Sequence, residues 1–356
     1  MNILIDIGHP AHVHFFKNFI REMENRGHKI VVNTVNKEIT LDLLEAYNIE
    51  YILYGKRSNN LLGHFVELIK RDYQIYKIQK KYDIDIIVGI SDMFGAHVSK
   101  ITKADSIVFT DTEHAKIINI LTQPFASIIC TPSCYQIDIG KKQFPYNGYH
   151  ELAYLHPNHF CPDSTVLDEL GLTENDPFII LRFVSWNASH DVGQHGISDK
   201  VGLVKKLENY GRVLITSEGT LPKELQPYQI QVSPDKLHDL LYYATLYVGE
   251  GGTTAAEAAV LGTPSIFVSS LAGTMGNFIE LEETYDLLYS FTDSDAALFK
   301  AREILQNPAR KEAWRIKFEH LLKDKIDVTA FMVWFIENYP QSTKQLKENP
   351  DFQNKF

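Results

Sequence analysis

A glycine-rich stretch at residues 246–268, LYVGEGGTTAAEAAVLGTPSIFV, is the part of the sequence best suited to hold a phosphate. Its pattern predicts a strand, a glycine loop, a helix and a second strand. Such a loop collects free backbone N–H groups at the positive end of the helix dipole, which favours phosphate binding. The spacing fits neither GxGxxG nor GxxxxGK[ST], so an ordinary strand-to-helix turn is the alternative. The candidate phosphate-binding residues are Gly251, Gly252, Thr253 and Thr254, and the two threonines are placed to cap the helix.

Glu257 follows about one turn into the same helix (~3.6 residues per turn). Its carboxylate is placed to accept hydrogen bonds from two vicinal hydroxyls, such as those of a ribose. The stretch is therefore a candidate phosphate site, followed by a carboxylate that is suited to the hydroxyls of a ribose.

Three histidines, His9, His12 and His14, follow the first predicted strand at residues 2–7. An imidazole with a pKa of about 6.5 is suited to removing a proton from a hydroxyl. His9 and His12 are the candidates for this role. A helix-capping histidine is one alternative. A metal site is another, but no cluster of Asp, Glu or Cys supports it, so we predict no metal ligands.

Carboxylates follow two further predicted strands, at residues 85–90 and 106–110. Asp92 comes after the first, and Asp111 and Glu113 come with His114 after the second. Asp111 and Glu113 are close in sequence, and close carboxylates separate each other's pKa values, which can supply an acid and a base from one site. Asp92 and Glu113 are the catalytic candidates, and helix capping is the alternative for Asp92 and Asp111.

The second half of the chain offers two polar loops after predicted strands at residues 178–184 and 212–217. Arg182 is suited to a bidentate contact with a diphosphate. Ser185 offers a hydrogen-bond donor, and Trp186 offers a surface on which a base or a sugar can stack. Ser217 and Glu218 form a polar turn after the second of these strands and are further candidates for ligand contacts. An ordered surface loop is the alternative in both places.

The elements that position these residues alternate between strand and helix, which predicts parallel sheets covered on both faces. The fold class is α/β, with two doubly wound Rossmann-like domains facing a central cleft. We expect the N-terminal domain at residues 1–150, a linker at 151–177, the second domain at 178–325, and a C-terminal helix and tail at 326–356. A strand is also expected at residues 229–232, and the polar end from residue 340 is expected to be loose.

The 356-residue chain has 35 basic and 45 acidic residues, a net charge of −10. This balance argues against nucleic-acid binding. Three cysteines without a CxxC pair indicate reduced cytosolic thiols. No secretion signal or long apolar run is present, so we expect a cytoplasmic protein. The basic helical region at residues 61–81 leaves a peripheral membrane contact open, although a solvated helix face is the simpler interpretation.

Four strings, IDIGHPAHVHFFKN, FTDTEHAKIIN, LRFVSWNASHD and GEGGTTAAEAAVLGTPSI, identify the chain as a member of the domain-of-unknown-function 354 family. The glycine stretch also resembles the GT-B-fold lipid II GlcNAc transferase and the non-hydrolysing UDP-GlcNAc 2-epimerases. The resemblance implies a GT-B fold, a diphosphate on the glycine loop and a ribose on Glu257. It also implies acceptor-binding or catalytic roles for His9 and His12.

The epimerases have catalytic carboxylates in the loops where this chain has Asp92 and Glu113. The residues around Asp92 differ from the epimerase motif Gly-Asp-Thr. The epimerase motif His-Arg-Arg-Glu-Asn is absent from the loop after Arg182.

Three functions fit these patterns. The first is a metal-independent glycosyltransferase of surface-polysaccharide or glycolipid synthesis, with a UDP-sugar as donor and a sugar or lipid-linked acceptor. The second is a UDP-sugar 2-epimerase, in which Asp92 and Glu113 move protons. The third is a nucleotide-sugar-binding protein without turnover. No cofactor beyond the donor substrate is expected.

Overall fold

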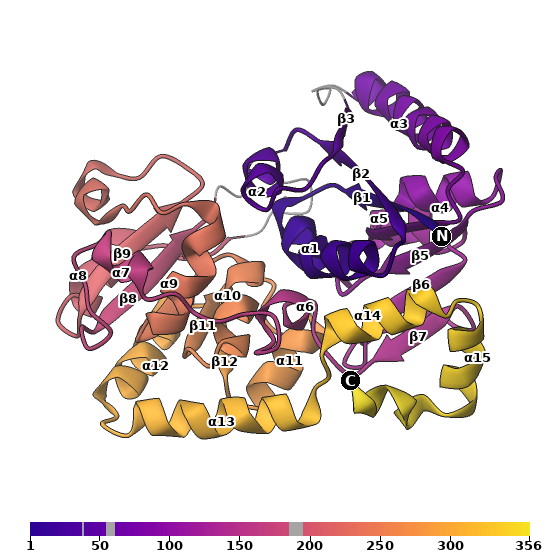
Figure 1. Ribbon diagram of the computed structural model, residues 1–356. Helices are drawn as coiled ribbons and strands as arrows, with labels where there is room; N and C mark the ends of the chain where they lie inside the picture. The colour runs from indigo at the N-terminus through magenta and orange to yellow at the C-terminus, as the bar shows by residue number, and fades with distance from the viewer. Residues whose placement is uncertain (38, 55–60, 185–194) are drawn as a thin grey trace. The chain divides into compact units, whose positions relative to one another are not determined.

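A computed structural model describes residues 1–37, 39–54, 61–184 and 195–356, and for residues 61–66 it describes the backbone alone (Figure 1). The chain forms two compact units. The first comprises Met1–His159 and Lys325–Phe356, and the second comprises Phe160–Asp324. Each unit is built around its own parallel sheet, as the alternation of strands and helices predicts.

The first unit contains a seven-stranded sheet in the order β3-β2-β1-β4-β5-β6-β7. Every neighbouring pair is parallel. The strand order reverses between β1 and β4, and ligands in such sheets bind beyond the carboxyl ends of the strands at this point. The strands are β1 (Asn2–Ile7), β2 (Lys29–Val35), β3 (Ile52–Tyr54), β4 (Ile86–Ile90), β5 (Asp105–Phe109), β6 (Ile128–Pro132) and β7 (Gln143–Tyr146).

Helices pack on this sheet in two groups. The helices are α1 (Pro10–Asn25), α2 (Thr40–Ala46), α3 (Leu61–Tyr82), α4 (Met93–Ser99), α5 (Lys116–Thr122), α6 (Leu152–Leu155), α14 (Val328–Glu337), α15 (Gln341–Glu348) and the 3-10 turn η3 (Pro350–Lys355). Helix α1 contacts α6 and α14, so the end of the chain (yellow) lies beside its beginning (indigo) (Figure 1). Helices α3 and α4 instead enclose a core with Leu4 and Ile87 of the strands. All residues of α6 are buried, so this part of segment 151–177 belongs to the core.

The second unit contains a five-stranded parallel sheet in the order β12-β11-β10-β8-β9. The order reverses between β8 and β10, which places the predicted ligand edge at the carboxyl ends of those strands. The strands are β8 (Phe178–Phe183), β9 (Arg212–Ser217), β10 (Leu246–Gly249), β11 (Ser265–Val268) and β12 (Leu288–Phe291). The helices are α7 (Thr165–Asp168), α8 (Lys200–Leu207), η1 (Lys223–Tyr228), η2 (Pro234–Lys236), α9 (Leu237–Tyr243), α10 (Gly252–Val260), α11 (Gly276–Glu283), α12 (Ser294–Gln306) and α13 (Arg310–Asp324).

Two local predictions were wrong. Residues 229–232 form no strand, because only Gln229 makes a bridge, to Ile215 of the edge strand β9. The end of the chain is not loose, because α15 and η3 return Phe352 and Phe356 to the ring of Trp334, with centroid distances of 4.9 and 5.3 Å. Aromatic packing fixes this segment despite its polar composition.

Candidate functional site

The glycine loop lies at the carboxyl end of β10, at the point where the second sheet reverses its strand order. Helix α10 begins at Gly252 and has Gly251 as its N-cap residue. The first N–H groups of a helix have no intrahelical acceptor, so this end presents donors to a ligand. Capping by Thr253 or Thr254 was predicted and is wrong, because both lie inside the helix and no side chain of the described residues caps it.

The glycines of this loop have different surroundings. A Cβ on Gly249 would lie 2.1 Å from the hydroxyl oxygen of Tyr247, so the strand needs glycine for internal packing. A Cβ on Gly251 would instead lie 3.5 Å from Nε of Arg182. The guanidinium group of Arg182, from β8, therefore lies at van der Waals distance from this position at the amino end of α10. A cation beside free amide donors is an arrangement that favours an anion.

Arg182 is paired with Glu218. Its guanidinium donates a hydrogen bond of 3.0 Å to Oε1 of Glu218, which follows β9. Both side chains are partly exposed. Ser217 accepts a hydrogen bond from the backbone of Gly219 and donates one to its carbonyl, so this hydroxyl shapes its own turn. Ser185 and Trp186 lie outside the described residues.

Glu250, between the glycines, ties the loop to two other segments. Its carboxylate accepts hydrogen bonds from the backbone N–H groups of Val184 (3.0 Å) and Ile197 (2.8 Å). It also accepts one of 3.2 Å from Nζ of Lys200. These donors satisfy a charge that would otherwise repel a phosphate at the same loop. The sequence signal for this residue, an acid between two glycines, was visible but received no role.

Glu257 is buried in α10 and forms a pair with His238 of α9. Oε1 of Glu257 lies 3.0 Å from Nε2 of His238, and both side chains are almost fully buried. Sequence reasoning did not find His238, because its partner is in another helix. The pair fixes the position of the Glu257 carboxylate.

In the first unit, Asp92 joins a buried ionic cluster at the carboxyl ends of β1 and β4. Arg71 donates to Oδ2 of Asp6 at 3.0 Å, and Asn33 donates to Oδ1 at 2.6 Å. Oδ1 of Asp92 accepts a hydrogen bond from the N–H of Gly95, so Asp92 is the N-cap of α4. Burial, followed by the charge of Asp6, raises the pKa of Asp92 to about 8. Asp92 therefore keeps its proton at neutral pH.

His9 and His12 use the same ring nitrogen to bind the backbone. Nδ1 of His9 accepts from the N–H of Ala11 at 3.2 Å and caps α1, as the helix-capping alternative predicts. Nδ1 of His12 accepts from the N–H of Gly8 at 3.3 Å. Burial, and then the neighbouring His9 and His150, hold the pKa of His12 well below its usual value. Neutral His12 thus carries its proton on Nε2 and is a hydrogen-bond donor.

The two carboxylates of the second acidic loop have different partners. Asp111 does not cap α5, whose N-cap is Ala115 without a side-chain bond. It pairs instead with His150, with 3.1 Å between Oδ2 and Nδ1. Glu113 is buried and its Oε1 accepts from the N–H of Gln136 at 3.2 Å. The structure therefore brings Asp111, His150 and His12 into one electrostatic group, while Glu113 is held by a different segment.

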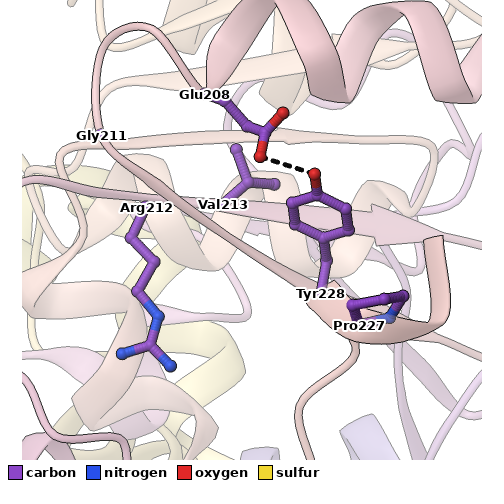
Figure 2. Close-up of a pocket in the computed structure, with 6 residues that line it drawn as sticks. All are labelled: Glu208, Gly211, Arg212, Val213, Pro227 and Tyr228. Atoms are coloured by element: carbon purple, nitrogen blue, oxygen red, sulfur yellow. Dashed lines mark hydrogen bonds between the residues drawn. The ribbon is translucent and has the colours of Figure 1, made fainter. Parts of the chain in front are cut away.

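A separate hollow of about 360 Å³ lies in the second unit, where the hydroxyl of Tyr228 donates to Glu208 (Figure 2). Arg212, the first residue of β9, lines it, so it lies at the amino edge of the sheet, away from the glycine loop. Within the described ranges, no three His, Cys, Asp or Glu side chains are grouped to hold a metal ion. Nor is any helix in this part of the chain long and apolar enough to cross a bilayer.

The fold is similar to several solved structures at low sequence identity. The S. aureus MnaA–UDP co-structure has a TM-score of 0.68 and 11% identity, with 96% of this chain and 97% of that chain covered. The Methanocaldococcus jannaschii UDP-GlcNAc 2-epimerase in complex with UDP-GlcNAc and UDP has a TM-score of 0.61 and 18% identity, with 89% of this chain and 98% of that chain covered. Glycosyltransferase VinC in complex with DTDP has a TM-score of 0.62 and 11% identity, with 97% of this chain and 100% of that chain covered. The chain has the GT-B fold, which confirms the predicted fold class.

A relative in Methanocaldococcus jannaschii, the uncharacterized protein MJ0665, is 24% identical over 279 residues, which are 75% of this chain and 81% of that protein. The family model described as "Protein of unknown function (DUF354)" matches residues 1–330. The four motifs singled out in the sequence therefore indicated the right family. The chain belongs to the DUF354 family.

Proposed function

We propose that this protein is a glycosyltransferase that uses a nucleoside-diphosphate sugar as donor. The observation that carries the proposal is the approach of Arg182 to Gly251 at the amino end of α10. A guanidinium group beside the first N–H groups of a helix matches the charge and the acceptor oxygens of a diphosphate.

The donor half of the reaction belongs to the second unit. The N–H groups of Gly252, Thr253 and Thr254 bind phosphate oxygens, and Arg182 exchanges Glu218 for the diphosphate. These groups stabilise the negative charge that develops on the leaving nucleoside diphosphate, without a metal ion. Glu257, held by His238, accepts hydrogen bonds from the ribose. Ser217, Glu218, Ser185 and Trp186 remain candidates for contacts with the base or sugar.

The acceptor half belongs to the first unit. Its carboxyl edge carries a neutral donor, His12, a protonated carboxyl, Asp92, and the buried carboxyl of Glu113. A neutral donor beside carboxyl groups suits a sugar, which has many hydroxyls. We propose a sugar or lipid-linked acceptor of surface-polysaccharide or glycolipid synthesis.

A UDP-sugar 2-epimerase is the second candidate, and the raised pKa of Asp92 favours it. In that reaction a base removes the proton from C2 of the sugar, and the C1–O bond to UDP breaks with its electron pair leaving on UDP. Re-addition of UDP from the same face and return of a proton to the other face of C2 complete the inversion. A carboxyl with a pKa near neutrality suits both proton transfers.

One experiment separates these functions. The purified protein is incubated with UDP-GlcNAc and a panel of other UDP-sugars, with and without sugar and polyprenyl-linked acceptors, and the products are followed by NMR. Transfer predicts UDP release and a new glycosidic bond only when an acceptor is present. A C2 epimer formed without an acceptor would show the second candidate. UDP binding without any product would mean a binding protein and would overturn both enzymatic proposals.

A further inference from the structure

Asp111 and His150 form a carboxylate–imidazole pair that the proposal above does not use. Asp111 follows β5, and His150 lies in the turn before α6, so the fold brings together two loops at the carboxyl edge of the first sheet. Oδ2 of Asp111 is 3.1 Å from Nδ1 of His150, whose side chain is 9% exposed. Although burial opposes it, the charge and hydrogen bond of His150 lower the pKa of Asp111 to about 2. The carboxylate of Asp111 is therefore ionised and accepts a hydrogen bond from Nδ1 of His150, which carries the ring proton.

The other ring nitrogen of His150 is left with its lone pair. Nε2 is buried, and among the residues that the structure describes it has no hydrogen-bond partner. Phe15 and Tyr146 pack against the ring, with centroid distances of 4.5 and 6.4 Å. Leaving a buried polar atom unpaired is costly, so such an atom needs explanation by a role or by a partner from outside the chain. A hydroxyl that donates to Nε2 would supply that partner.

The two histidines predicted from the sequence have the opposite arrangement. Nδ1 of His9 and Nδ1 of His12 each accept a backbone N–H, so their neutral rings carry the proton on Nε2. A ring in this state donates a hydrogen bond and cannot accept a proton at Nε2. Of these three imidazoles, His150 is the one prepared to act as a base at Nε2.

We propose that His150, oriented by Asp111, accepts the proton of the acceptor hydroxyl, with His12 beside it as a neutral donor; this inference rests on the transfer reaction proposed above. The acceptor O–H bond breaks, and its proton moves to Nε2 of His150. The oxygen's electron pair forms the new bond to C1 of the donor sugar. The bond between C1 and the diphosphate oxygen breaks, and its electron pair leaves on the nucleoside diphosphate. Asp111 stabilises the imidazolium of His150 until His150 releases the proton to water.

The test compares three variants of the full-length protein. His150→Gln removes the base, and Asp111→Asn presents an amide donor to Nδ1, which moves the ring proton to Nε2. His97→Gln is the matched control, because His97 also pairs with a carboxylate, Asp72, at 3.2 Å, outside the proposed site. Release of UDP from UDP-GlcNAc is measured with water and with a sugar as acceptor. Binding of UDP is measured by calorimetry, and folding by circular dichroism.

We expect kcat of His150→Gln and Asp111→Asn to fall about 10²–10⁴-fold, the usual contribution of a general base. KM for the donor and the Kd for UDP should change less than about threefold, and His97→Gln should keep the wild-type rate. Normal kcat in a folded His150→Gln protein would overturn the role of His150 and leave the transfer proposal intact. Failure of the wild type to release UDP from any donor of the panel would overturn the transfer proposal itself.

A second readout does not depend on turnover. Long-range ¹H–¹⁵N NMR of the histidine-labelled protein at pH 7.5 reports which ring nitrogen carries the proton, and His150→Gln assigns the signal. The inference requires the proton on Nδ1 of His150, on Nε2 of His12, and on Nε2 of His150 in Asp111→Asn. A proton on Nε2 of His150 in the wild type would overturn the inference, whatever the activity.

Discussion

The guanidinium group of Arg182 lies beside the missing side chain of Gly251, where a Cβ would be 3.5 Å from Nε. The same Cβ would lie 3.4 Å from Cγ1 of Val184, which is ordinary van der Waals contact. A single methyl group therefore fits, but a branched side chain would displace the guanidinium from the amino end of α10. This distinction gives a direct test of the proposed phosphate site.

Gly251→Val should weaken UDP binding at least about tenfold while the protein stays folded, because it removes the charge-assisted contact of Arg182. Gly251→Ala should change the Kd for UDP less than about threefold. Isothermal titration calorimetry measures both. Gly249→Ala is the contrasting control, since its Cβ would meet the Tyr247 hydroxyl at 2.1 Å and should destabilise the fold by about 1–3 kcal/mol. Equal UDP affinity in Gly251→Val and the wild type would contradict the proposal that a phosphate binds at this position.

The pair of Arg182 and Glu218 predicts opposite effects for its two members. Arg182→Ala should weaken UDP binding about 10–100-fold, the range expected for hydrogen bonds to a charged group. Glu218→Gln should leave UDP binding unchanged or strengthen it, because Arg182 then has no ion pair to break before it contacts the diphosphate. The pair is partly exposed, so neither change should alter the melting temperature by more than a few degrees. Similar loss of affinity in both variants would show that the pair is structural.

Glu257 predicts discrimination at the ribose. The wild type should bind UDP about tenfold more tightly than 2′-deoxy-UDP, because one hydrogen bond to a charged acceptor is lost. Glu257→Gln should reduce this ratio while His238 keeps a partner in the amide oxygen. Competition binding of the two nucleotides to wild type and variant gives the ratio. A ratio that does not change would assign Glu257 to packing with His238 alone.

Asp92 predicts a pH dependence of stability. Its pKa is about 8 in the folded protein and about 3.9 in an unfolded chain, so between these values the folded state binds the extra proton. The contribution of Asp92 to the free energy of unfolding should therefore be greatest below about pH 4 and should fall as the pH rises to about 8. About 6 kcal/mol is the upper limit for this effect, because the two pKa values differ by about four units and each unit corresponds to about 1.4 kcal/mol.

Asp92→Asn tests this sign, because asparagine can still cap α4 through the N–H of Gly95. Urea unfolding followed by circular dichroism at pH 5 and pH 9 should show the variant gaining stability over the wild type as pH rises. A constant difference at both pH values would mean that Asp92 is ionised throughout this range.

The order of strands and helices could be predicted because apolar runs and glycine turns alternate so regularly. Strands β7 and β12 were not predicted, since QFPY and LYSF are four-residue runs without a clear periodicity. The helix at the glycine loop begins at Gly252, not at the threonines, because Gly251 itself takes the N-cap conformation. Local preference therefore indicated the element and not its first residue.

The loops of the candidate site could be predicted from their place after strands, but their partners could not. Glu257 meets His238, and Asp111 meets His150, through packing of elements that no local pattern connects. Asp6 did offer a signal, because a carboxylate within the apolar run NILIDI must be paired when it is buried. Arg71, its partner, looked from the sequence like one more charge on a basic helix.

The chain leaves the first unit after His159 and re-enters it at Lys325, and these junctions are neighbours. Nε2 of His159 lies 2.8 Å from Oδ1 of Asp327, and the N–H of Ile326 donates to the carbonyl of Asn147 at 3.0 Å. Residues 160–324 are thus a contiguous segment inserted into the first unit. The two points of the first unit between which it is inserted already lie side by side. Exchange of that one segment, by recombination or by design, would replace the loops proposed to bind the nucleotide while the first unit kept its core and its histidines.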